Sequence, residues 1–146
     1  MNNQHSPDPK GVLLAFFAAM DGWEQAAIQR SDKFVPTTDS EIVAFREREA
    51  EIRRKAMVPF CTDECISRVG LVSMRCSPSQ YGLAGGHVVD CEVKGNKATI
   101  ITEGKNNFPE SKDRYIFLLV LEDDGWKING KKEVSESGRQ RKVELF

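Results

Sequence analysis

The sequence predicts an α+β fold, in which helices pack on one face of an antiparallel sheet. The first half of the chain carries apolar residues at helical spacing, and the second half carries extended runs separated by short turns that contain glycine. A block of helices followed by a block of strands is typical of this fold class. The clearest single signal is the stretch 114–129, which we interpret as two long strands joined by a turn at Asp124-Gly125.

Length and composition limit the classes of function. The 146 residues fit a single domain over 1–146, with residues 1–7 as a terminal tail. The net charge of −1 argues against a nucleic-acid partner. No run approaches the ~20 apolar residues of a membrane span, and no signal peptide is visible, so we expect a cytoplasmic protein that does not bind membranes. The four cysteines lack zinc-site spacing, so we expect buried thiols, no metal and no cofactor.

Two long helices and one short helix are expected before the strands. The first begins at Asp8-Pro9, where Asp8 can cap the first amides, and ends between residues 29 and 32. The second begins with a capping box from Thr38 to Glu41. We expect its mostly apolar stripe to be formed by Ile42, Phe45, Glu49, Ile52 and Ala56.

The remaining side of the second helix is charged, and its residues 46–48, 51 and 53–55 are expected to be solvated. Along this helix the pairs Glu49–Arg53 and Glu51–Lys55 have favourable spacing. A third helix is expected from Thr62 to about residue 69. The expected strands cover residues 71–76, 87–94, 97–103, 113–122 and 126–133, with a further edge strand within 142–146.

The hairpin turns assign side chains to faces. If Asp124-Gly125 is the turn, Leu121 opposes Ile128, and the apolar face that packs on the helices contains Tyr115, Phe117, Leu119, Leu121, Trp126 and Ile128. The opposite face then carries Ile116, Leu118, Val120 and Glu122 against Glu133, Lys131, Asn129 and Lys127. A second turn at Gly95-Asn96 adds Val88, Asp90 and Glu92, opposite Glu103, Ile101 and Thr99.

This second face is the predicted partner surface, because exposed apolar groups of such extent usually contact another chain. The candidate anchors are Ile116, Leu118 and Val120, and the candidate rim residues are Asp90, Glu103, Glu122, Lys127 and Lys131. A homodimer through the same face is the alternative. In that case the partner would contact the loops 80–86 or 106–112, which makes Tyr81 a further candidate.

Several segments together resemble the nuclear-transport-factor-two-like immunity proteins of bacterial polymorphic toxin systems. They are residues 9–24, Phe60-Cys-Thr62, Ser77-Pro-Ser-Gln-Tyr81, Lys97-Ala-Thr-Ile-Ile-Thr102, Tyr115-Ile-Phe-Leu and Gly125-Trp-Lys-Ile128. The resemblance implies a cone of three helices on a curved antiparallel sheet. It also implies a non-catalytic cytosolic protein that binds and neutralises a cognate toxin delivered by contact-dependent or type VI secretion. The loop Gly82-Leu-Ala-Gly-Gly86 departs from the family pattern.

Related cone folds also include small-molecule-binding proteins and enzymes such as isomerases and dehydratases. The candidates for such a site are His87, Asp90, Tyr81, Tyr115 and Trp126. In a regular strand His87 and Asp90 face opposite ways, so they would not form an acid–base pair. The aromatic residues of the first helix and of the hairpin are expected to fill the core. We therefore favour binding without catalysis.

Overall fold

The computed structural model describes residues 8–68, 87–105, 112–135 and 137–143. The expected strand at 71–76, the loops 77–86 and 106–111, and the candidate Tyr81 lie outside these residues. In the described part, three helices precede five strands: α1 (Pro9–Lys33), α2 (Asp39–Met57), α3 (Asp63–Ser67), β1 (His87–Lys94), β2 (Lys97–Lys105), β3 (Lys112–Glu122), β4 (Gly125–Val134) and β5 (Gln140–Val143).

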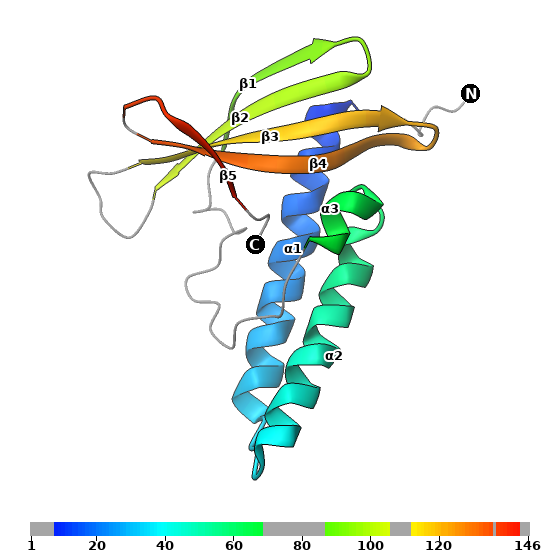
Figure 1. The fold of residues 1–146 in the computed structure, drawn as a ribbon, viewed down its shortest axis with the longest axis vertical. Coiled ribbons are helices and arrows are strands. Elements are labelled where there is room, and N and C mark those ends of the chain that lie inside the picture. Colours follow the sequence, from blue (N-terminus) through cyan, green and yellow to red (C-terminus); the bar gives the residue numbers. More distant parts are fainter. Residues whose placement is uncertain (1–7, 69–86, 106–111, 136, 144–146) are drawn as a thin grey trace.

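The strands form one antiparallel sheet in the order β1-β2-β3-β4-β5. All three helices lie on the same side of this sheet, and the far end of the α1–α2 hairpin projects away from it (Figure 1). The predicted α+β class, with three helices before an antiparallel sheet, is confirmed. No helix in the described part of the chain combines the length and hydrophobicity that a membrane crossing needs.

The helix starts follow from local capping. Asp8 accepts a hydrogen bond from the Gly11 amide at 2.7 Å, as predicted. The Thr38 hydroxyl accepts one from the Glu41 amide at 3.2 Å, which confirms half of the capping box. In the other half, the Glu41 carboxylate accepts from the amide and hydroxyl of Thr37 and not from the Thr38 amide that a capping box requires. The Thr37 hydroxyl and amide lower the pKa of Glu41.

The buried side of α2 differs from the predicted stripe. It consists of Phe45, Glu49, Ala50, Arg53 and Met57, whereas Ile52 is 40% exposed. Arg53, expected in solvent, is buried with its guanidinium carbon 5.5 Å from the Trp23 ring centroid. Glu49, expected to pair along the helix, accepts two hydrogen bonds from Arg30 of α1. The predicted stripe was right at Phe45 and Glu49 and wrong at Ile52, and it missed Arg53 because α1 supplies polar and aromatic partners that α2 alone does not reveal.

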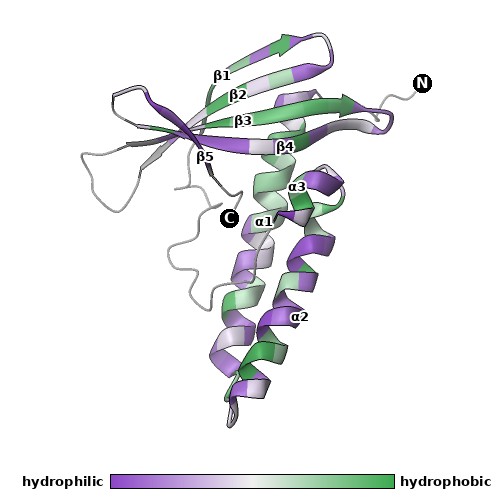
Figure 2. Cartoon of the chain, viewed as in Figure 1, coloured by the Kyte–Doolittle hydropathy of each residue, from purple (hydrophilic) through white to green (hydrophobic). Residues whose placement is uncertain are grey.

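The core lies between the sheet and the part of the helices next to it. Leu13, Phe16 and Met20 of α1 pack with Ile100 of β2 and with the completely buried Ile128 of β4, among others. Cys61 and Cys65 are buried, as expected, but Cys91 on the edge strand β1 is exposed, so that expectation was wrong. Figure 2 shows β3 as mostly hydrophobic beside the hydrophilic stretches of β4 and β5.

The β3–β4 hairpin has a different turn from the predicted one. Glu122 pairs with Gly125, so the turn residues are Asp123 and Asp124, and Gly125 begins β4 with φ +122°. Leu121 consequently opposes Trp126. The register moves by two positions, which leaves the predicted faces unchanged near the turn because side chains alternate with a period of two.

A bulge farther along β4 does change the faces. Leu119 pairs with Ile128 but Leu118 pairs with Gly130, so Asn129 is an extra residue on β4. Beyond it, Phe117 opposes Lys131 and Ile116 opposes Lys132. The prediction that Lys131 lies opposite Leu118, away from the helices, was therefore wrong. Lys131 lies on the core side, with Nζ 4.2 Å from the Tyr115 ring centroid.

The β1–β2 hairpin confirms its predicted turn, since Lys94 pairs with Lys97. A second bulge between Val88 and Asp90 places Val88 opposite the buried Thr102, on the core side, which corrects its predicted face. Because β1 is not a regular strand at this point, the alternation argument that separated His87 from Asp90 does not apply. The pairs Asp90–Ile101 and Glu92–Thr99 are as predicted.

Candidate partner-binding face

The sheet has one face that the described helices do not cover (Figure 1). We call it the outer face, and define it as the side chains that the strand register places away from the core. Its described members are Asp90, Glu92, Lys94, Lys97, Thr99, Ile101, Glu103, Arg114, Ile116, Leu118, Val120, Glu122, Lys127, Lys132, Val134, Gln140 and Lys142. It therefore includes all of the predicted candidates except Tyr81 and Lys131, which lies on the core side.

One row of the outer face crosses all five strands. Its members, one from each strand, are Asp90, Ile101, Ile116, Lys132 and Lys142. Adjacent strands lie about 4.8 Å apart, so the row is about 19 Å long. It begins with a carboxylate on edge strand β1 and ends with two ammonium groups on β4 and edge strand β5. The charge along this row therefore changes from negative at the β1 edge to positive at the β5 edge.

Apolar residues occupy the centre of the outer face. Ile101, Leu118 and Val120 are partly exposed, and none of them belongs to the core cluster beneath the sheet. Ile116 also lies outside that cluster but is only 8% exposed, so the expectation that it is an exposed anchor was wrong. Its neighbours across the row are Ile101 and Lys132. The exposed apolar part of the outer face is therefore centred on Leu118 and Val120.

Leu118 has an uncovered flank because of its partner on β4. That partner is Gly130, and a Cβ added there would lie 3.8 Å from Leu118 Cδ1. Because Gly130 has no side chain, this strand partner does not cover Leu118 on the outer face.

The predicted acidic residues differ in how far their carboxylates are exposed to solvent. Asp90 is exposed, and its Oδ1 accepts a hydrogen bond from the Cys91 amide at 2.9 Å. Glu122 is exposed at the end of β3. The side chain of Glu103 is only 17% exposed, and its Oε2 lies 2.6 Å from Arg114 Nη2 on the neighbouring strand. Asp90 and Glu122 remain open to solvent, while Glu103 is held within the sheet.

Lys127 is used within the chain. Its ammonium donates to the Pro59 carbonyl at 3.2 Å and lies 3.1 Å from Asp124 Oδ2, and its side chain is only 11% exposed. The hydrogen bond from Lys127 lowers the pKa of Asp124. Lys127 therefore joins β4 to the segment that precedes α3, and it is not an open rim residue.

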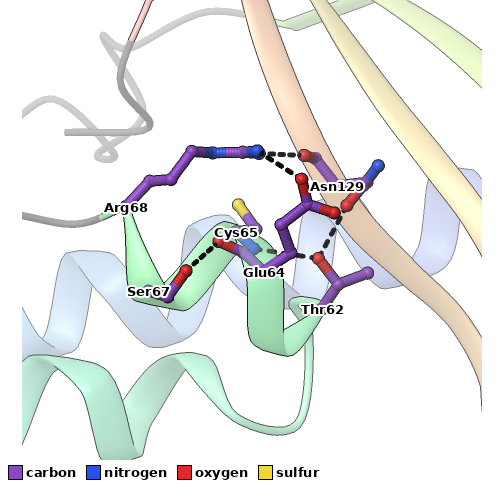
Figure 3. Close-up of polar contacts among 6 residues, drawn as sticks. All are labelled: Thr62, Glu64, Cys65, Ser67, Arg68 and Asn129. Atoms are coloured by element: carbon purple, nitrogen blue, oxygen red, sulfur yellow. Dashed lines mark hydrogen bonds and ion pairs between the residues drawn. The ribbon is translucent and has the colours of Figure 1, made fainter.

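The residues that flank α3 on both sides hold the bulge in β4 in place (Figure 3). The Thr62 hydroxyl donates to Asn129 Oδ1 at 2.8 Å and accepts from the Cys65 amide at 3.1 Å. Arg68 donates to the Asn129 carbonyl at 2.7 Å and pairs with Glu64 at 3.0 Å. Side-chain and backbone groups of Asn129 are thus bound from both ends of α3.

The same junction contains the two buried cysteines. Cys61 forms a parallel bridge with Ile128, and Cys65 lies in the first turn of α3. A hydrogen bond between their thiols, together with burial, raises the pKa of Cys61. Among the described residues no group of three or more His, Cys, Asp or Glu side chains is arranged to hold a metal ion. The junction is organised by its hydrogen bonds.

The model of the NTF2 fold immunity protein family matches residues 8–142, which includes all three helices and almost the whole sheet. The chain belongs to this family. The predicted resemblance to nuclear-transport-factor-two-like immunity proteins is therefore confirmed. Comparisons with curated proteins and with solved structures found no match.

Among the outer-face residues of this immunity protein that sequence reasoning missed are Lys132 and Lys142. Lys132 was missed because the bulge at Asn129 reverses the faces of the rest of β4, and Lys142 because no register was assigned to the last strand. A signal was present in Asn129-Gly130, since a glycine inside a strand often marks a bulge.

Proposed function

We propose that this immunity protein neutralises its toxin by binding to it through the outer face and blocking it, without chemistry of its own. The toxin would reach the cytoplasm by contact-dependent or type VI secretion and meet the immunity protein there. The observation that carries the proposal is the partly exposed apolar strip of Ile101, Leu118 and Val120, on a sheet face that no described helix covers.

The composition of the outer face supports this proposal. Specific interfaces combine a few apolar anchors at the centre with a polar rim that excludes water. Leu118 and Val120 are the central anchors, and Gly130 leaves Leu118 uncovered on this face. The exposed Asp90, Glu122 and Lys142, together with the half-buried Lys132, form the rim. Occlusion needs only this complementarity and no reactive group.

The first test is the substitution Leu118→Asp, measured by calorimetry against the cognate toxin domain, which a pull-down with the wild-type protein as bait would identify. We expect the wild-type protein to bind and the variant to lose at least about 30-fold in affinity, because a charge would replace a central anchor. In co-expression, cells carrying the variant should lose protection from the toxin.

The matched control is Val43→Asp, which places the same charge at a 52% exposed valine on the projecting end of the helical hairpin. It should bind like the wild type. Equal binding by the two variants would refute the outer face as the site. Light scattering adds a second criterion, because a tight dimer that Leu118→Asp dissociates would assign the face to a second copy.

A further inference from the structure

Two lysines at the β5 end of the outer face are directly opposed. Lys132 of β4 pairs with Lys142 of β5, and directly opposed side chains have Cβ atoms about 4.5–5.5 Å apart. Like charges in this arrangement destabilise a sheet. Within the described residues, neither lysine makes a hydrogen bond or an ion pair. The nearby Glu133 pairs across the strands with Arg141, at 3.4 Å, on the opposite face.

The position of Lys132 depends on the bulge. Without the extra residue Asn129, alternation would bring Lys131 to the outer face and turn Lys132 toward the core. Instead Lys131 lies over the rings of Tyr115 and Phe117, at 4.2 and 5.6 Å from Nζ to the ring centroids. Thr62 and Arg68 fix the bulge through Asn129. Specific hydrogen bonds therefore maintain the arrangement that places Lys132 on the outer face beside Lys142.

We propose that the Lys132–Lys142 pair binds carboxylates on an acidic surface of the toxin. The inference rests on the proposed function of the outer face and adds the chemistry and the orientation of the partner. A carboxylate between the two ammonium groups would neutralise both and remove their mutual repulsion. The acidic part of the toxin then lies over β4 and β5, and a part that tolerates or complements Asp90 lies over β1.

An acidic protein surface fits this face better than a nucleic acid does. A nucleic acid needs an extended track of cations along its phosphates. Here the row that ends in the two lysines passes over Ile116 and Ile101 and reaches Asp90 at its other end, about 19 Å away. The apolar centre and the distant carboxylate favour a protein with its own apolar patch next to its acidic one.

The test compares two double charge reversals, one on the outer face and one on the helices. Lys132→Glu with Lys142→Glu should weaken binding of the cognate toxin domain at least about 10-fold and reduce the salt dependence of its affinity. Lys33→Glu with Lys55→Glu reverses two exposed lysines of α1 and α2, on the other side of the sheet, and should change affinity less than about 3-fold. Lys132→Ala with Lys142→Ala removes both ammonium groups and therefore their repulsion. Without these charges the variant should bind the toxin domain more weakly, and without the repulsion it should be at least as stable as the wild type.

The outcomes separate this inference from the proposed function. If Leu118→Asp abolishes toxin binding but both lysine reversals behave alike, the outer face is the site and the lysine inference is overturned. If wild-type protein does not bind the toxin domain, both fall. The wild-type protein could also be tested with a 20-nucleotide single-stranded DNA. Tight binding that is lost in the Lys132/Lys142 reversal would overturn the inference in favour of nucleic acid. A dimer that the same reversal dissociates would overturn it in favour of a second copy.

Discussion

At the scale of single residues, a buried charge joins the two long helices where the sheet does not support them. Glu49 of α2 has a side chain only 5% exposed and accepts hydrogen bonds from Arg30 at 2.7 and 2.8 Å. This hydrogen bond raises the pKa of Arg30. Phe34 and Phe45 stack nearby, with ring centroids 4.1 Å apart. Since a buried carboxylate is costly unless it is paired, the ion pair specifies how the helices align.

We expect Glu49→Gln to destabilise the protein by about 1–2 kcal/mol, because it removes the charge that two charge-assisted hydrogen bonds depend on, while Arg30 remains partly solvated. The control is Glu51→Gln, which affects only the exposed Glu51–Arg54 pair at 3.8 Å and should cost less than about 0.5 kcal/mol. Urea denaturation followed by circular dichroism measures both. Equal losses in the two variants would show that the Arg30–Glu49 pair has no special role.

At the scale of elements, the strand β4 shows where sequence reasoning succeeded and where it failed. The existence of the strand was predictable from its alternation, and the start of α3 from the capping residue Thr62. The bulge was not predicted, because it is held by contacts between Asn129 and residues of α3 that lie 61 and 67 positions away in the chain. Local patterns predict elements, but the register depends on distant partners.

The contribution of this contact can be measured with Thr62→Val. The substitution removes both the hydrogen bond to Asn129 and the helix cap on the Cys65 amide, so we expect a loss of about 1–2 kcal/mol in unfolding free energy. Thr62→Ser keeps the hydroxyl and should retain most of the stability. Because the bulge orients Lys132, the valine variant should also weaken toxin binding more than the serine variant. Chemical denaturation and calorimetry test the two expectations, and indistinguishable valine and serine variants would contradict them.

At the scale of the whole molecule, the predicted architecture was correct because independent signals agreed. The caps at Asp8, Thr38 and Thr62 and the turn at Gly95-Asn96 each had a local physical cause, and the structure shows each of them. The candidate face was predicted in outline. The two lysines at its β5 end were not predicted, because Lys132 reaches that face only through the bulge in β4.

The same architecture predicts an order of local stability. The residues of β2 and β3 that face the core, such as Ile100, Phe117 and Leu119, are fully or almost fully buried, whereas residues 89–94 of edge strand β1 are exposed on both faces. Hydrogen-exchange mass spectrometry should therefore find β1 amides exchanging at least about 10-fold faster than those of β3, which open only with global unfolding.

This order bears directly on the proposed function. Leu118 lies outside the core cluster, so Leu118→Asp should leave the slow exchange of β2 and β3 unchanged while it abolishes toxin binding. Such a result separates loss of the partner surface from loss of the fold. If β1 is protected as long as β3, its edge is covered in solution. If Leu118→Asp accelerates exchange throughout the sheet, Leu118 supports the fold itself, and the outer face cannot be assigned to the toxin from that variant's loss of binding.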